Sequence, residues 1–169
     1  MTPAFAAASL VFTGLCVGCL VYLHLAPTGY SPVRHAVSRY GVGAYHRWYE
    51  AQAACAGIAG ILLAVALRHP RHVVVLLVVF GGARLAITQF PMDTRRGGHA
   101  LLAIVAFGSA TSAAIRLPAS LHGTPPLGWA MLAALVAGIL LRELAFGLAE
   151  RAFYLAMLAW LVLVATRLV

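Results

Sequence analysis

The stretch from Pro27 to Glu50, PTGYSPVRHAVSRYGVGAYHRWYE, is the longest polar segment of a chain that is otherwise strongly apolar. It holds three of the twelve arginines, two of the seven histidines and one of the four carboxylates. Apolar runs of roughly the length that crosses a bilayer lie on both sides of it. We therefore expect this stretch to lie at a membrane surface and to form one wall of a polar site.

The composition indicates an integral membrane protein. Hydrophobic residues make up 63% of the 169 residues and charged residues 9%, whereas soluble proteins carry about 25% charged residues. The net charge of +8 comes from arginines at the ends of apolar runs, which is typical of residues that set membrane topology. A nucleic-acid-binding protein would gather such charge in a basic domain. We expect membrane lipids as partners, and no nucleic acid.

The apolar runs predict six transmembrane helices in an all-α polytopic bundle. We place the first five at about residues 3–25, 48–67, 73–90, 99–116 and 127–146, and the sixth from a turn at Glu150 and Arg151 to Val169. No polar linker interrupts this series. The whole chain, residues 1–169, is therefore expected to form a single transmembrane domain.

The polar stretch itself predicts a short interfacial helix between the first two spanning helices. Apolar residues recur there at helical spacing, namely Val33, Ala36, Val37 and Tyr40. The opposite face carries Arg34, His35, Ser38 and Arg39. A stripe of this kind, followed by an aromatic segment that leads into the second helix, is typical of a helix lying on the membrane surface.

In a protein with six spans, the first, third and fifth loops share one side of the membrane. All four carboxylates and seven arginines fall on or near that side. The positive-inside rule places it in the cytoplasm, provided that these arginines mark topology and do not belong to a site. The absence of lysine beside abundant alanine, glycine, arginine and valine points to a GC-rich bacterial gene, so we expect the bacterial cytoplasmic (inner) membrane.

Arg84 is an arginine inside a predicted spanning helix, about 9 Å from the helix end at 1.5 Å per residue. A charge at the bilayer centre costs about 2.5–3.5 kcal/mol on the insertion scale. Arg84 is therefore expected to face the bundle and to pair with Asp93, Glu50 or Glu143. Both a structural ion pair and a ligand-binding role fit this position.

These charges predict a polar pocket at one membrane interface that binds an anionic lipid headgroup or another small anion. The guanidinium fork suits phosphate and carboxylate. The expected ligand-binding residues are Arg34, Arg39, Arg84, Arg95 and Arg96, together with Glu50 and Glu143. A lipid-binding, scaffold or sensor-like role would follow.

Two other classes of function remain open. The first is an intramembrane enzyme acting on a lipid, with His35, Ser38, Asp93 and His99 as acid–base or nucleophilic groups, although no GxSxG element is present. The second is a transporter, or a membrane subunit that binds b-type haem or metal, with His24 and His99 as possible axial ligands. No local spacing of ligands predicts a metal site, and no cofactor is assigned. A second copy or another membrane protein is a possible partner.

Three strings in this order resemble one known family: HLAPTGYSPVRHAVSRYGVG from His24, ARLAITQFPMD from Ala83, and GGHALLAIVAF from Gly97. They resemble the bacterial six-helix membrane family catalogued as domain of unknown function nine-nine-eight. Its motifs would fall on His35, Ser38 and Gly41, on Phe90, Pro91 and Asp93, and on Gly98 and His99. The segment between Asp93 and His99 is shorter than in many relatives. The resemblance implies a helical membrane fold and no established activity.

Overall fold

The computed structural model describes residues 2–119 and 124–169, and this part of the chain is helical with no strand. Its α-helices are α1 (Thr2–Leu25), α2 (His46–Leu67), α3 (Arg71–Ala86), α4 (Arg96–Arg116), α5 (Pro125–Leu140) and α6 (Phe146–Thr166). Two short 3-10 helices, η1 (Val37–Gly41) and η2 (Ile87–Gln89), lie in the connections. The predicted all-α class is confirmed.

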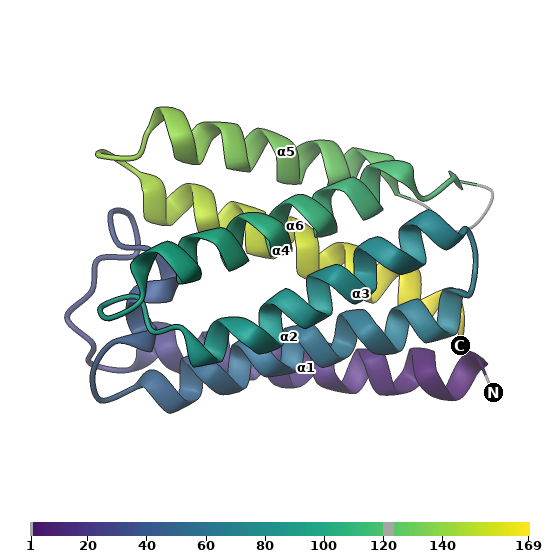
Figure 1. Ribbon diagram of the computed structural model, residues 1–169, viewed down its shortest axis with the longest axis horizontal. Coiled ribbons are helices and arrows are strands. Elements are labelled where there is room, and N and C mark those ends of the chain that lie inside the picture. The colour runs from purple at the N-terminus through teal and green to yellow at the C-terminus, as the bar shows by residue number, and fades with distance from the viewer. Residues whose placement is uncertain (1, 120–123) are drawn as a thin grey trace.

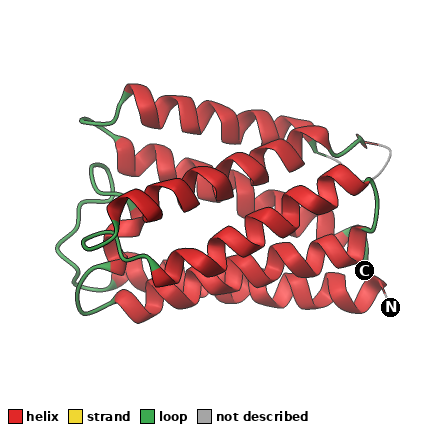
Figure 2. Ribbon diagram, in the orientation of Figure 1, coloured by secondary structure: helices red, strands yellow, loops and turns green. Residues whose placement is uncertain are grey.

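The six helices run along the long axis of one bundle (Figure 1). The connections from α1 to α2, from α3 to α4 and from α5 to α6 gather at one end, whereas both chain termini lie at the other (Figures 1 and 2). The first, third and fifth loops, which were predicted to share one side of the membrane, therefore lie at the same end of the bundle (Figure 1). We call this side the loop end of the bundle.

In the described part of the chain, five helices are long and apolar enough to cross a membrane: α1, α2, α3 with η2, α4 and α6. They indicate a multi-pass membrane protein. The remaining helix, α5, has 16 residues and is about 24 Å long at 1.5 Å per residue, against about 30 Å of hydrocarbon. The fifth helix was expected to reach residue 146, but it ends at Leu140. The connection to α6 then forms turns in which Leu144 and Ala145 donate their N–H groups to the carbonyl of Leu141.

The interfacial helix predicted over residues 31–41 is not present as a continuous amphipathic helix. The connection from α1 to α2, which we call loop 1 (residues 26–45), contains only the five-residue η1. The reason is that α6 satisfies backbone groups that a helix would pair internally. Val37 donates its N–H to Glu150 Oε2 at 2.6 Å, and the carbonyl of Val33 accepts from Leu148 N at 3.1 Å.

Small residues bring α2 and α3 into close contact. Gly57 and Gly81 face each other, and a Cβ added at Gly81 would lie 2.6 Å from the carbonyl oxygen of Gly57. The neighbouring Gly82 points away, because a Cβ added there meets nothing within 4 Å. Glycines at such crossings let helix backbones approach closely in membrane proteins. The contact matters for the site because α3 carries Arg84.

The two adjacent glycines of α3 provide a matched test of this packing. We expect Gly81→Ala to lower the free energy of unfolding by about 1–3 kcal/mol, because overpacking forces the helices apart. Gly82→Ala should cause no loss and a gain of up to about 1 kcal/mol, because alanine is the better helix former. Thermal unfolding in detergent, followed by circular dichroism, measures both. Equal melting temperatures for the two variants would contradict the close contact.

Candidate functional site

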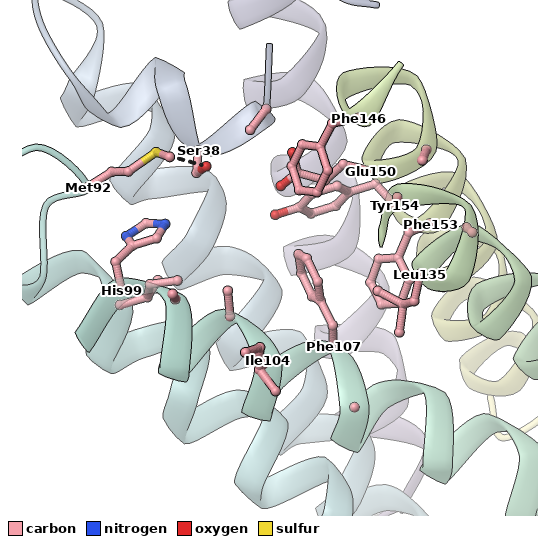
Figure 3. Close-up of a pocket in the computed structure, with 18 of the residues that line it drawn as sticks. Ser38, Met92, His99, Ile104, Phe107, Leu135, Phe146, Glu150, Phe153 and Tyr154 are labelled. Carbon is pink, nitrogen blue, oxygen red and sulfur yellow. Dashed lines mark hydrogen bonds between the residues drawn. The ribbon is translucent and has the colours of Figure 1, made fainter. Parts of the chain in front are cut away.

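A cavity of about 420 Å³ lies among α4, α5 and α6, next to loop 1 and the end of α3. Its wall is mostly apolar and includes Ala103, Ile104, Phe107, Gly108, Ala134, Leu135, Gly138, Ile139, Phe146, Ala149 and Phe153. Figure 3 shows Phe107 and Ile104 on one wall, with Leu135 and Phe153 beside them. The volume lies within the range of about 300–1,000 Å³ typical of small-molecule sites.

The cavity reaches the surface of the bundle between α4 and α5. Ile104 on α4 and Ile139 on α5 both line it, yet they are 70% and 73% exposed. Gly108, also in the wall, is exposed as well. The opening therefore lies beside α4, one of the helices long and apolar enough to cross a membrane.

The opposite end of the cavity, toward the loop end of the bundle, is polar. Six polar side chains from η1, α2, α3, α4 and α6 meet there: Ser38, Tyr49, Arg84, His99, Glu150 and Tyr154. In Figure 3, Ser38 and His99 lie across the cavity from Glu150 and Tyr154, whose oxygen atoms point into the space between them. We call these six residues the polar end.

Arg84 is the buried cation of the polar end, with 1% of its surface exposed. Its Nη2 donates to Gln52 Oε1 at 2.9 Å, and Gln52 Nε2 in turn donates to Cys16 Sγ at 3.2 Å. The guanidinium carbon lies 5.6 Å from the centroid of the Tyr154 ring, a cation–π contact. Arg84 Nε is buried and has no hydrogen-bond partner among the described residues.

The prediction that Arg84 pairs with a carboxylate of Asp93, Glu50 or Glu143 is wrong, because none of the three forms an ion pair with it among the described residues. Asp93 is exposed and accepts from the N–H of Thr94 at 2.9 Å. Glu143 lies at the surface, 3.7 Å from Arg142. Glu50 lines a second, much smaller pocket next to Ser38 and His99. An amide and an aromatic ring contact the cation instead.

His99 presents an acceptor to the cavity. Its Nδ1 lies 2.8 Å from the carbonyl oxygen of Phe90, and because a carbonyl can only accept, Nδ1 carries the hydrogen. In the neutral ring Nε2 is therefore an acceptor, and it is buried without a partner among the described residues. The ring stacks on Tyr49 with centroids 6.4 Å apart.

Arg151 holds loop 1 next to the polar end through hydrogen bonds, and we call these contacts the Arg151 anchor. Its Nη1 donates to the carbonyls of Pro32 at 2.7 Å and His35 at 2.9 Å, and to that of Gly147 in α6. Its Nη2 donates to Tyr40 Oη at 3.1 Å. Because Ala36 and Ser38 of loop 1 line the cavity, this anchor helps to close its polar end.

His24 completes the Arg151 anchor. Its Nδ1 lies 2.7 Å from the carbonyl oxygen of Leu20, and its Nε2 accepts from Arg151 Nε at 2.6 Å. Both ring nitrogens are thus used within the protein, and His24 does not line the cavity with His99. The axial pair considered from the sequence is not assembled. Among residues 2–119 and 124–169, no group of three or more His, Cys, Asp or Glu side chains lies close enough to hold a metal ion.

The structure brings together only some of the residues singled out in the sequence. Arg84, Ser38 and His99 line the cavity. The exposed arginines Arg34, Arg39, Arg95 and Arg96 lie at the loop end outside it. The remaining enzyme candidates also lie outside: His35 Nδ1 accepts from the N–H of Ser31, and Asp93 is exposed.

Three residues that shape the polar end did not stand out in the sequence: Gln52, Glu150 and Tyr154. The turn predicted at Glu150 and Arg151 is wrong, because both lie within α6. The signal that was available is their spacing. Gly147, Glu150 and Tyr154 recur at i, i+3 and i+7, which marks one face of a helix, and that face meets loop 1 and Arg84.

Long apolar helices around a laterally open cavity define a multi-pass helical membrane protein with a candidate site at one end of its bundle. The chain belongs to the family described as "Protein of unknown function (DUF998)", whose model matches residues 6–167. This match confirms the resemblance carried by the three sequence motifs. No curated protein and no solved structure matches the chain.

The Arg151 anchor can be tested by removing it. We expect Arg151→Ala to lower the free energy of unfolding by at least about 2 kcal/mol, because hydrogen bonds to charged groups contribute about 1.5–3 kcal/mol. Loop 1 should also be released, so trypsin should cut after the exposed Arg34 and Arg39 several times faster. Arg142→Ala is the control, because an exposed ion pair contributes about 0–1 kcal/mol. Unchanged cleavage rates in Arg151→Ala would contradict the anchor.

Proposed function

We propose that this protein binds an amphipathic membrane lipid, with an alkyl chain in the cavity between α4 and α5 and the headgroup at the polar end. The observation that carries the proposal is the form of the cavity. Its apolar part opens where the exposed Ile104 and Ile139 form the rim, and its closed end holds Arg84, His99 and Glu150. An amphipathic lipid likewise has an apolar chain at one end and a polar headgroup at the other.

The surroundings of the cavity support a chain that enters sideways from the bilayer. A chain gains little free energy on moving from lipid into an equally apolar cavity. The apolar wall therefore supports occupancy by lipid chains in general, and selectivity has to come from the polar end.

The charge of the loop end supports an anionic headgroup. That end carries four exposed arginines: Arg34, Arg39, Arg95 and Arg96. Arg84 lies at the polar end of the cavity. Basic groups at a membrane surface attract anionic lipids by about 1 kcal/mol each. We place the protein in the bacterial cytoplasmic membrane, in a scaffold or sensor-like role in which lipid occupancy is the signal.

Filling the cavity tests the proposal. Gly108 lines the cavity, and a Cβ added there meets nothing within 4 Å, so Gly108→Trp has room to project a ring into the chain site. We expect this variant to weaken binding of a fluorescent single-chain lipid tenfold or more and to lose lipid detected by native mass spectrometry.

The matched control is Gly14→Trp. Gly14 is also a helical glycine with open space around it, but it lies on α1 and does not line the cavity. Lipid binding in this variant should equal that of the unmodified protein. Equal binding by Gly108→Trp and the unmodified protein would rule out the cavity as the lipid site.

A further inference from the structure

The hydrogen-bonding groups of the polar end constrain the headgroup beyond its charge. Arg84 Nε is a donor, and His99 Nε2 is an acceptor because Nδ1 already donates to the carbonyl of Phe90. Both atoms are buried without partners among the described residues, and both residues line the cavity. A buried polar group of this kind needs a partner, and leaving it unpaired costs free energy. A ligand therefore fits best if it supplies both an acceptor and a donor.

Glu150 strengthens the requirement for a donor. Its carboxylate lines the cavity, and its only hydrogen bond in the described part of the chain comes from the N–H of Val37. It forms no ion pair with Arg84 within 4.0 Å, since the described residues contain only the pair between Arg142 and Glu143. A headgroup made only of acceptors, such as a fatty-acid carboxylate, would leave His99 Nε2 unpaired.

The size of the cavity limits the apolar part of the ligand. Its volume of about 420 Å³ lies near the lower end of the range for small-molecule sites, about 300–1,000 Å³. The opening is a single cleft between two neighbouring helices, lined by Ile104 and Ile139. One alkyl chain suits this space better than the paired chains of a bilayer phospholipid.

We propose that the ligand is a single-chain phospholipid with a free hydroxyl beside its phosphate, a lysophospholipid. Its phosphate accepts from Arg84 Nε, its hydroxyl donates to His99 Nε2, and its chain lies between α4 and α5. This inference rests on the proposed function and adds the class of lipid. Phosphate suits the guanidinium as a charge-assisted acceptor, and the hydroxyl supplies the donor that a fatty acid lacks.

The test is a competition series on the purified, detergent-solubilised protein against a fluorescent lysophospholipid. The competitors share one chain length: the lysophospholipid, its 2-O-methyl ether, the monoacylglycerol and the fatty acid. Free glycerol phosphate is added as the headgroup without a chain. We expect the lysophospholipid to compete at least tenfold better than every other member, a difference of about 1.4 kcal/mol. The methyl ether is decisive because it keeps the oxygen and replaces the donated hydrogen with a methyl group.

The variant His99→Phe examines the hydroxyl contact, since it keeps an aromatic ring against Tyr49 and removes the acceptor. The tenfold preference for the free hydroxyl over the methyl ether should disappear in this variant. His46→Phe is the control, because His46 Nδ1 also contacts a carbonyl, that of Gly43 at 2.9 Å, but the ring is exposed and lies outside the cavity. The preference should persist there.

The outcomes separate this inference from the proposed function. Equal competition by the lysophospholipid and its methyl ether, or stronger competition by the fatty acid, would overturn the inference. The lipid site would still stand if Gly108→Trp weakened binding of all chain-bearing competitors. Failure of every single-chain competitor, or equal competition by free glycerol phosphate, would overturn the proposed function itself. A preference that persists in His99→Phe would overturn the assignment of the hydroxyl to His99.

Discussion

The burial of the Arg84 guanidinium is the constraint on which the rest of this structure depends. A charge within a membrane helix is tolerated when it faces the bundle and finds partners there. Gln52 from α2 supplies an acceptor and the Tyr154 ring from α6 supplies a π face, so helices distant in sequence must converge on α3. The close contact of Gly57 with Gly81 brings α2 near enough to α3. These partners are neutral, and they leave Arg84 Nε without a hydrogen-bond partner among the described residues.

The start of α6 holds loop 1 in position through two adjacent charged residues. Glu150 and Arg151 are neighbours in sequence, and both hold loop 1 through its backbone: Glu150 accepts from Val37, and Arg151 donates to Pro32 and His35. Because these groups are satisfied by α6, the loop needs no regular helix of its own. The same contacts position Ser38 and Ala36 in the cavity wall. Loop 1 therefore supplies residues of the cavity wall, and α6 holds that loop in position.

Much of the site was accessible from the sequence, because polar residues are conspicuous in an apolar chain. Arg84, Ser38 and His99 were singled out by charge, motif and position, and all three line the cavity. The partner of Arg84 was not identified from the sequence, because charge complementarity favoured a carboxylate and Gln52 is uncharged. The exposed arginines were expected in the pocket because sequence indicates the membrane side of a residue and not the direction of its side chain. Glu150 was placed in a turn because charged residues in an apolar chain often mark the end of a spanning helix.

The sequence by itself determined the class of the protein, since repeated apolar runs leave few structures other than a helical bundle in a bilayer. It also determined which loops share a side, because that follows from the alternation of spans. Only the tertiary structure decided that α5 ends at Leu140, that loop 1 rests on α6, and that a cavity opens between α4 and α5. These features depend on contacts between residues far apart in the chain. Helical periodicity shows that a face is apolar, but not whether a neighbouring helix or a lipid covers it.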